Sequence, residues 1–412
     1  MTNLPRGWEV KKLEEIANIK GGKRLPKGEN LLDNNTKFAY IRVADFQDNG
    51  TINLQNIKFI NENTYNVLKN YKIYDDNLYI SIAGTIGKSG IIPKELNGAI
   101  LTENAVKLEY IQNNISNKFM YFFTLSNIFK TQIQTSTKIV AQPKLAITRL
   151  KQIQIPLPPL QEQERIVGIL DESFAKIDES IKILEQDLLN LDELMQSALQ
   201  KAFNPLKDNA KENYQLPQGW EWKSLGDIGE IITGTTPSKN NPNFYGNEYP
   251  LFKPSDLNGD MIIKYASDNL SKLGFDNARN IPKDTILVVC IGASIGKVGL
   301  SGIIGSCNQQ INAIIPNSKF LPKFLFFLCL SNYFQEILKN NASQTTLPII
   351  NKTEFSKLQI PLPPLQEQEQ IASYLDELSL NIKDLKQNYQ AQIKNLQELK
   401  KSLLDKAFKG KL

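Results

Sequence analysis

The chain repeats itself along most of its length, and this repeat is the feature that most restricts its fold. Leu-Pro-Arg-Gly-Trp at residues 4–8 recurs as Leu-Pro-Gln-Gly-Trp at 216–220. The block Gln-Ile-Pro-Leu-Pro-Pro-Leu-Gln-Glu-Gln-Glu at 154–164 recurs unchanged at 359–369. Self-similarity over such a length is typical of a structural unit that is built twice. The sequence therefore predicts two similar modules in one chain.

The spacing between the two copies changes along the repeat. It is 212 residues at the start and 205 residues from the Phe-rich segments at 119–127 and 324–332 onward. It stays at 205 to the chain end, where Lys-Ala-Phe at 201–203 matches 406–408. Insertions and substitutions are tolerated mainly in loops. We therefore expect variable loops in the first part of each module and a part of constant length behind it.

Each copy shows the same order of local patterns. A stretch of about 150 residues comes first, with short β-branched runs such as 286–291 that are typical of strands. A short helix is predicted near residues 118–130 and 322–338. Pro-Pro pairs at 158–159 and 363–364 then favour the start of a long helix, because proline lacks an N–H that would be unpaired there anyway.

Both long segments carry apolar residues in steps of three and four, which is the heptad pattern of paired helices. In the first, predicted over residues 160–203, the stripe consists of Val167, Leu170, Phe174, Ile177, Ile181, Leu184, Leu188, Leu191, Met195, Ala198 and Ala202. In the second, the stripe consists of Ile371, Leu375, Leu378, Ile382, Leu385, Tyr389, Leu396, Leu399 and Leu403, with one interruption at Gln392. Each helix should be roughly 65 Å long.

An apolar stripe of this length needs a partner along all of it. A module of this size is too small to cover the whole helix, so we expect the two helices to pair with each other. Antiparallel pairing, with the modules at opposite ends, is predicted because the connection at 204–215 is too short to span a helix comfortably.

The predicted fold class is α+β: two β-rich α/β domains separated by two long antiparallel coiled-coil helices, with a pseudo-twofold internal repeat. The predicted segments are a first domain at 1–157, a first helix at 158–204, a linker at 205–215, a second domain at 216–362 and a second helix at 363–412.

The charge is divided unevenly between these parts. The whole chain carries +5, whereas residues 159–203 carry −6 and residues 364–408 carry −1, so the remaining 322 residues carry +12. Basic globular parts favour contact with a polyanion such as nucleic acid, and acidic or neutral helices favour contact with protein. Ordinary surface charge is the alternative interpretation.

The composition excludes several classes of function. The chain has no histidine, so His-based triads and His-metal sites are excluded. Cys290, Cys307 and Cys329 form no Cys-x-x-Cys pair, and we expect them to be buried and reduced. No apolar run approaches the ~20 residues of a membrane helix, and the N-terminus has no signal pattern, so the cytoplasm is the expected location.

Glycine-rich turns that contain lysine recur at residues 84–89 and 292–297. A P-loop needs a glycine five positions before its Gly-Lys pair, and Ile82 and Ile291 occupy that position, so ATP binding is not expected. These turns either contact phosphates or are plain hairpin turns, and the sequence leaves both interpretations open. The candidate residues in them are Thr85, Lys88, Ser294 and Lys297.

Polar loop residues that differ between the copies are the best candidates for reading bases. Arg, Lys and Gln fit major-groove edges, and Ser and Thr fit bases or phosphates. Solvated loop tips are the alternative for each residue. The candidates are Lys20, Lys23, Arg24 and Lys138 in the first copy and Thr235, Thr236, Lys239, Gln344 and Thr345 in the second. Asp45 and Asp256 recur without matching carboxylates and are interpreted as turn or helix-capping residues.

Together these features resemble the specificity subunit of type I restriction-modification systems. The residues that carry the resemblance are the Leu-Pro-x-Gly-Trp openings, the Ile-Gly-Lys-x-Gly turns, the doubled proline-glutamine block and the Lys-Ala-Phe helix ends. They follow the family's order over nearly the whole chain. The resemblance implies a non-catalytic subunit that supplies DNA specificity to a multisubunit adenine methyltransferase or restriction endonuclease.

The resemblance also implies the partners. Each target-recognition domain would read one half of a bipartite, asymmetric double-stranded DNA target, and the helices would fix the spacer. Two methyltransferase subunits would dock on the chain, and a restriction or translocase subunit can join them. No cofactor is expected in this chain, since S-adenosylmethionine and ATP with Mg²⁺ belong to partner subunits. The competing hypotheses are a non-catalytic coiled-coil scaffold without sequence-specific readout and an enzyme that acts on DNA alone.

Overall fold

The chain packs into two compact units. The structure is a computed structural model that describes residues 4–136, 144–203, 216–259, 261–318, 320–343 and 346–412. The first unit consists of residues 1–184 and 391–412, and the second consists of residues 185–390. Each unit therefore combines one β-rich domain with a part of each long helix. The predicted linker at 205–215 lies outside the described residues.

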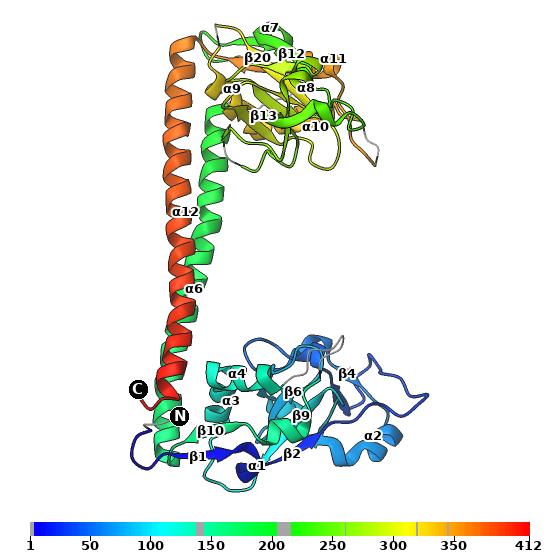
Figure 1. Ribbon diagram of the computed structural model, residues 1–412, viewed down its shortest axis with the longest axis vertical. Coiled ribbons are helices and arrows are strands. Elements are labelled where there is room, and N and C mark those ends of the chain that lie inside the picture. Colours follow the sequence, from blue (N-terminus) through cyan, green and yellow to red (C-terminus); the bar gives the residue numbers. More distant parts are fainter. Residues whose placement is uncertain (1–3, 137–143, 204–215, 260, 319, 344–345) are drawn as a thin grey trace. The chain divides into compact units, whose positions relative to one another are not determined.

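The first unit is built mainly from short strands in three sheets (Figure 1). Its strands are β1 (Glu9–Lys12), β2 (Ala17–Gly21), β3 (Ala39–Ile41), β4 (Lys58–Phe59), β5 (Lys72–Ile73), β6 (Leu78–Ser81), β7 (Ser89–Ile91), β8 (Ala99–Leu101), β9 (Ala105–Tyr110) and β10 (Gln154–Leu157). Its helices are α1 (Leu13–Ile16), η1 (Val43–Asp45), η2 (Leu54–Asn56), α2 (Glu62–Leu68), η3 (Lys69–Tyr71), η4 (Lys94–Leu96), α3 (Asn117–Leu125), α4 (Asn127–Ser136) and α5 (Ile147–Lys151). The strand orders are β1-β10, β2-β9-β6-β7 and β4-β3-β8-β5.

The second unit contains the same three sheets. Its strands are β11 (Glu221–Ser224), β12 (Gly229–Thr233), β13 (Tyr245–Phe252), β14 (Ile262–Ile263), β15 (Asp268–Leu270), β16 (Asn280–Ile281), β17 (Ile286–Val289), β18 (Val298–Ser301), β19 (Gly305–Cys307), β20 (Ile311–Pro316) and β21 (Gln359–Leu362). Its helices are α7 (Leu225–Ile228), η5 (Pro242–Phe244), α8 (Lys272–Asn277), α9 (Pro322–Leu330), α10 (Asn332–Asn340) and α11 (Lys352–Ser356). The strand orders are β11-β21, β12-β20-β17-β18-β14 and β15-β13-β19-β16, so β14 is an added edge strand.

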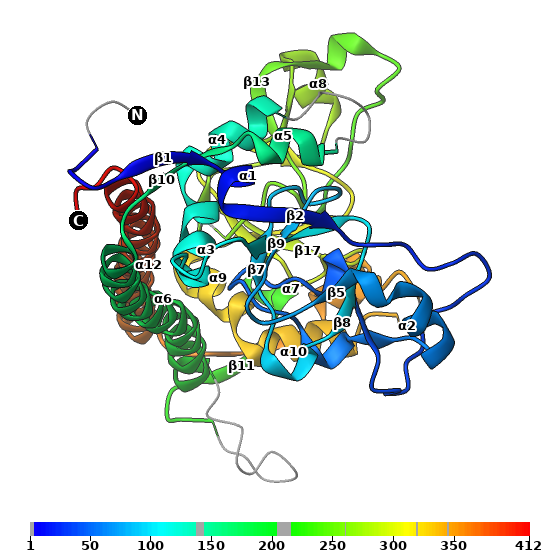
Figure 2. The same cartoon turned by 90° about the horizontal axis from the view of Figure 1, so that it is seen from below.

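Both long helices begin directly after the Pro-Pro pairs. They are α6 (Leu160–Phe203) and α12 (Leu365–Ala407), with 44 and 43 residues. In the first unit Asp178 of α6 forms an ion pair with Lys400 of α12, and Arg165 donates to the backbone oxygen of Leu412 at 2.8 Å. Residue numbers rise along α6 while those of the partners, on α12 and in the segment that follows it, fall. The helices therefore run antiparallel, side by side, in this unit (Figure 2).

The same direction holds in the second unit. Asp192 of α6 forms an ion pair with Lys386 of α12, and further along α6 Phe203 shares one core with Leu375. Stripe residues of both helices also share a core within each unit, Leu170 with Leu403 in the first and Ala198 with Leu375 in the second. The predicted α+β fold with two β-rich domains and antiparallel helices is confirmed.

The Lys-Ala-Phe end of each long helix closes the core of the domain built from the other copy. The ring of Phe408, which is 1% exposed, lies 5.1 Å from that of Phe119 and 5.5 Å from that of Phe123 between centroids. In the second unit, the ring of Phe203 lies 5.3 Å from that of Phe324. Removing a buried aromatic leaves a cavity, so these helix ends are constrained to keep both the residue and its position.

The unchanged proline-glutamine block contains a buried amide. The side chain of Gln163 accepts a hydrogen bond from the backbone N–H of Ser116 at 2.9 Å and donates to the carbonyl of Pro158 at 2.9 Å. Gln368 does the same in the second unit, where it accepts from the N–H of Leu321 at 3.1 Å. A buried polar group is costly when unpaired, which explains why this block tolerates no drift.

The single short helix predicted near 118–130 and near 322–338 is in each case two helices. α3 and α9 end before Ser126 and Ser331, and each serine hydroxyl accepts a hydrogen bond from a backbone N–H three residues later at 3.3 Å. A serine N-cap starts a new helix because it satisfies one of the unpaired N–H groups of the first turn. The apolar pattern alone did not reveal this break.

The three cysteines are free and buried, as predicted. Burial raises the pKa of Cys290 and of Cys307 to about 12, so these thiols stay protonated near neutral pH. Within the described ranges, no three His, Cys, Asp or Glu side chains gather as a metal-binding group. No helix in the part of the chain that the structure describes has the length and apolar character needed to cross a membrane.

Candidate nucleic-acid interface

Three loops of the first domain leave the sheet β2-β9-β6-β7 at the same edge. β2 ends at Gly21, opposite Val106 near the start of β9. β6 ends at Ser81, opposite Ala105 at the start of β9. The loop after β2, the β6–β7 turn and the β8–β9 turn therefore lie side by side. We call this surface the first loop edge, and it consists of residues 22–24, 82–88 and 102–104.

The second domain builds a matching surface from its own strands. β12 ends at Thr233 opposite Asn312, and β17 ends at Val289 opposite Ile311. The second loop edge consists of residues 234–239, 290–297 and 308–310. The two loop edges hold the described candidates Lys23, Arg24, Thr85 and Lys88, and Thr235, Thr236, Lys239, Ser294 and Lys297. The candidates Lys138, Gln344 and Thr345 lie outside the described residues.

The candidate Lys20 is placed differently from the others. It lies within β2 and forms an ion pair with Glu109 of the neighbouring strand at 2.5 Å. Glu109 also pairs with the almost fully buried Lys107 at 2.5 Å. Lys20 therefore belongs to a cross-strand charge cluster on the sheet, not to a loop tip.

The second sheet of each domain delivers a basic residue to the same surface. β3 and β8 are parallel, and Ile41 lies opposite Leu101, so Arg42 and Thr102 leave the sheet together. The Arg42 guanidinium donates to Asp45 at 2.6 Å, and the Arg42 backbone N–H donates to the same carboxylate at 2.7 Å. This contact raises the pKa of Arg42. Asp45 is 1% exposed and holds the turn, which confirms its structural interpretation.

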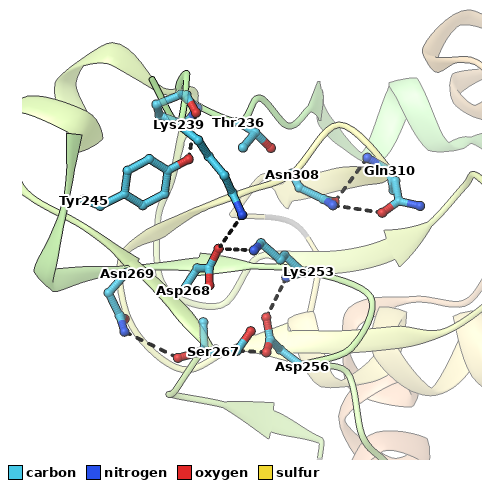
Figure 3. A network of polar contacts seen from close by, with 12 residues as sticks. Thr236, Lys239, Tyr245, Lys253, Asp256, Ser267, Asp268, Asn269, Asn308 and Gln310 are labelled. Atoms are coloured by element: carbon cyan, nitrogen blue, oxygen red, sulfur yellow. Dashed lines mark hydrogen bonds and ion pairs between the residues drawn. The ribbon is translucent and has the colours of Figure 1, made fainter. Parts of the chain in front are cut away.

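The equivalent position in the second domain is Lys253, and its surroundings differ. Its backbone N–H donates to Asp256 at 2.8 Å, so Asp256 is also a turn residue. Its ammonium group forms an ion pair with Asp268, and the ammonium of Lys239 lies 4.0 Å from that carboxylate (Figure 3). The hydrogen bond from Lys253 lowers the pKa of Asp268. The carboxylate of Asp268 thus lies close to the ammonium groups of both Lys253 and Lys239, and Lys239 belongs to the second loop edge.

One glycine in each domain lets the loop lie directly on the neighbouring turn. A Cβ at Gly22 would lie 2.1 Å from the carbonyl oxygen of Thr102, and a Cβ at Gly234 would lie 2.2 Å from that of Cys307. Real Cβ atoms do not approach that closely, so only glycine fits here without movement of the backbone. The loop backbone and the turn are therefore fixed against each other in both domains.

This packing brings one loop side chain against one turn side chain. In the first domain, Arg24 Nε donates to Glu103 at 2.7 Å, and the Arg24 side chain stays 79% exposed. The hydrogen bond to Glu103 raises the pKa of Arg24. Partial burial favours a higher pKa for Glu103, but the hydrogen bonds from Arg24 and Thr102 outweigh it and lower that pKa. In the second domain, the Thr236 hydroxyl donates to Gln309 Oε1 at 2.7 Å.

The glycine- and lysine-containing segments are hairpin turns. Gly84 and Gly87 have φ of 74° and 87°, and β7 follows Lys88 directly, so the lysine leads into a strand and not into a helix as a P-loop requires. Lys88 forms an ion pair with Asp48 at 2.7 Å, and Lys297 donates to the carbonyl of Pro254 at 3.4 Å. The hairpin interpretation is confirmed, and a phosphate contact by either lysine stays a prediction.

Most of the predicted cations already have carboxylate partners, which the sequence did not reveal. Ion pairs at exposed positions contribute only about 0–1 kcal/mol, so a phosphate or a base edge can replace the partner at little cost. The reasoning from sequence missed Glu103, Gln309, Arg42 and Lys253. The available signal was the repeat itself, since Glu103 and Gln309 take the same place after β8 and β19 and differ in charge.

Comparison with known proteins identifies the family. A family model described as the type I restriction modification DNA specificity domain matches residues 5–188 and again residues 217–395. The chain is 38% identical over 151 residues to the HindI specificity subunit of Haemophilus influenzae, a match that covers 36% of this chain and 33% of that protein. It is 24% identical over 438 residues to the StySPI specificity subunit of Salmonella potsdam, a match that covers 99% of this chain and 90% of that protein.

Two solved structures share the fold. One is a chain from work on complex assembly and conformational transition of the type I R-M system, with a TM-score of 0.81 and 22% identity over the whole of both chains. The other is the HsdS subunit from Thermoanaerobacter tengcongensis, with a TM-score of 0.62 and 22% identity over 100% of this chain and 98% of that one. With one family match for each copy of the repeat, the chain belongs to the type I restriction-modification DNA specificity family, a non-catalytic family that supplies DNA specificity.

Proposed function

We propose that each domain reads one half of a bipartite double-stranded DNA target through its loop edge. The observation that carries this proposal is that both domains bring polar loop residues to the same edge of the same sheet, yet differ in the residues at equivalent positions. Side chains that donate and accept at exposed loop tips suit base edges in the major groove. Because the two loop edges differ, the two half-sites are different and the target is asymmetric.

The long helices are proposed to fix the unread spacer and to hold the protein partners. Apolar side chains remain exposed on them, which is typical of a protein interface. In the second unit they include Leu189 at 57%, Leu194 at 48%, Leu380 at 58% and Leu385 at 40% exposed. We assign this docking to two methyltransferase subunits, with S-adenosylmethionine bound to them. A restriction or translocase subunit that uses ATP and Mg²⁺ would join the same complex, and no cofactor is assigned to this chain.

Methylome sequencing of a host that carries the full chain and its methyltransferase subunits tests the readout. The expected motif has two different half-sites separated by unread bases. A palindromic motif would argue against one distinct half-site per domain. A scaffold without DNA readout would leave no motif that depends on this chain.

The spacer role is tested by shortening both helices in register. The residue numbers of the ion pair in each unit, Asp178 with Lys400 and Asp192 with Lys386, both add up to 578. Deleting residues 181–187 together with 391–397 removes one heptad from each helix and keeps the remaining pairs. The spacer should shorten by about 10 Å, or about three base pairs, while both half-sites stay the same. A change in half-site bases would refute the spacer role, and deleting one heptad alone is the mismatched control.

A further inference from the structure

We propose that one pair of side chains in each loop edge specifies the base at an equivalent position of the two half-sites. The pair is Arg24–Glu103 in the first domain and Thr236–Gln309 in the second. Arg24 is assigned to a guanine, and Gln309 is assigned to an adenine. This inference rests on the proposed function and identifies residues that would make the two half-sites differ.

The backbone makes the two pairs equivalent. The Gly22 N–H donates to the carbonyl of Ala105 at 3.0 Å, and the Gly234 N–H donates to that of Ile311 at 3.0 Å. Each glycine also lacks room for a Cβ against the turn that it covers. Two residues after the glycine comes Arg24 or Thr236, and the turn beneath supplies Glu103 or Gln309. Both domains thus present one side-chain contact on one backbone frame.

In the first domain the arginine is the exposed member of the pair. Glu103 is 25% exposed and accepts from Arg24 Nε, whereas the Arg24 side chain is 79% exposed. An arginine held at Nε keeps its two terminal nitrogens for another acceptor, and a bidentate contact to guanine O6 and N7 needs such a planar pair of donors. Glu103 is therefore the positioning residue, and Arg24 is the reader.

In the second domain the exposed member comes from the turn. Gln309 is exposed, and the half-buried Thr236 donates its hydroxyl proton to Gln309 Oε1. This contact places Oε1 of the amide against the hydroxyl. It leaves Nε2 as a donor and a second lone pair on Oε1. Those two groups match N7 and the N6 amino group of adenine, the usual bidentate contact of glutamine.

A simple brace between loop and turn is the competing explanation. A brace would favour keeping the pair, as the glycines beneath it are kept, but the pair changes from charged to neutral between the copies. Exposed ion pairs also stabilise little, so Arg24–Glu103 contributes weakly as a brace. Because the side chains of the exposed pair differ between the domains while the backbone beneath them is the same, a role in reading a base is favoured over a role as a brace.

Selection of duplexes from a randomised library by the full chain in complex with its methyltransferase subunits tests the inference. The unaltered complex should select two different half-sites, and this step alone tests the proposed function. Arg24→Ala should weaken binding to that target about 10- to 100-fold and remove a guanine preference at one position of one half-site. Arg24→Thr with Glu103→Gln should shift that position toward adenine and leave all other positions unchanged.

The reciprocal change is Thr236→Arg with Gln309→Glu, which should bring guanine into the other half-site. Lys20→Ala is the matched control, since Lys20 is also an ion-paired cation of the β2 segment but lies within the sheet, and its base preferences should not change. The untouched half-site reports that each variant is folded. Unchanged preference at every position, or equal weakening on all sequences, would overturn the inference while the proposed function stands. No selected sequence with the unaltered complex would instead refute the proposed function.

Discussion

The two domains present different charges on one shared framework. Residues 1–158 contain 21 Lys and Arg against 13 Asp and Glu, a net charge of +8, whereas residues 204–363 contain 15 against 13, a net charge of +2. Yet the strand orders β2-β9-β6-β7 and β12-β20-β17-β18 correspond strand for strand. The net charge of +5 for the whole chain is therefore distributed unevenly, and the first domain should contribute most of the electrostatic attraction for a polyanion.

One pair of equivalent positions shows how side chains change between the domains while the backbone arrangement stays the same. Tyr71 and Arg279 both precede the strand that pairs with β8 or β19. In the first domain, the ammonium of Lys23 lies 5.9 Å from the centre of the Tyr71 ring. In the second, the backbone N–H of Arg279 donates to Thr235 Oγ1 at 2.9 Å. The basic residue is thus Lys23 of the loop in the first domain and Arg279, before the adjacent strand, in the second. The backbone keeps the two positions in contact in both domains, whereas the side chains at those positions differ.

The largest expected effect tests whether the two units are separate in stability. Phe408→Ala should cost the first unit about 3–5 kcal/mol and Phe203→Ala should cost the second a similar amount, because each removes a buried ring from an aromatic cluster. Hydrogen exchange measured on each variant should show faster exchange in one unit only. Equal loosening of both units by either variant would contradict the division into two.

A smaller loss of stability is expected when a methyl group is added at the glycine of each loop edge. Gly22→Ala and Gly234→Ala should each destabilise by about 1–3 kcal/mol, since the added Cβ meets a backbone carbonyl in both domains. Denaturant unfolding measures this. Gly168→Ala is the control. Gly168 lies in α6, and apart from neighbouring residues and the backbone of its own helix nothing lies within 4 Å of the added Cβ, so this change should stabilise by about 0.5–1 kcal/mol. An effect at only one of the two loop glycines would break the proposed equivalence of the loop edges.

Local patterns in the sequence were enough to predict the two long helices. The Pro-Pro pairs and the heptad stripe predict the start of α6 at Leu160 and its end at Phe203, and the structure has the same bounds. Both signals lie within a few residues of the feature that they specify. The serine that divides α3 from α4 is equally local, but its effect depends on a side chain that caps the next helix, which an apolar pattern does not register.

The partners of the candidate residues could not be predicted in this way. Arg24 and Glu103 are 79 positions apart, and only the pairing of β2 with β9, together with the turn that joins β8 to β9, brings them together. A lysine or arginine in a loop looks unpaired in sequence, because cross-strand contacts depend on register, and no short pattern specifies the register between distant strands. Aligning the two copies position by position is the sequence signal that comes nearest to revealing such pairs.

A still smaller effect compares the helix pair in the two units. Asp178→Asn and Asp192→Asn each remove one exposed ion pair between α6 and α12 and should cost less than about 1 kcal/mol. The loss should be larger at Asp178, whose partner Lys400 also lies 4.8 Å from the centre of the Phe174 ring and is held there. Thermal unfolding at low and high salt measures both. Losses that do not shrink with added salt would mean that the two carboxylates act through packing and not through charge.

The smallest expected effect is on stability at acidic pH, where the two loop edges should behave differently. The hydrogen bonds that lower the pKa of Glu103 make its contribution to stability present above the ordinary value of 4.5 and lost as the pH falls through the lowered value. The unfolding midpoint of Glu103→Gln should therefore fall below that of the unaltered chain near pH 7 and match it at strongly acidic pH. Gln309 does not titrate, so Gln309→Ala should show no such convergence. Thr236→Arg with Gln309→Glu should make the stability of the second domain sensitive to acidic pH as well, because the backbone places the new carboxylate against the new guanidinium. If that sensitivity does not appear, the two loop edges hold their pairs in different geometries.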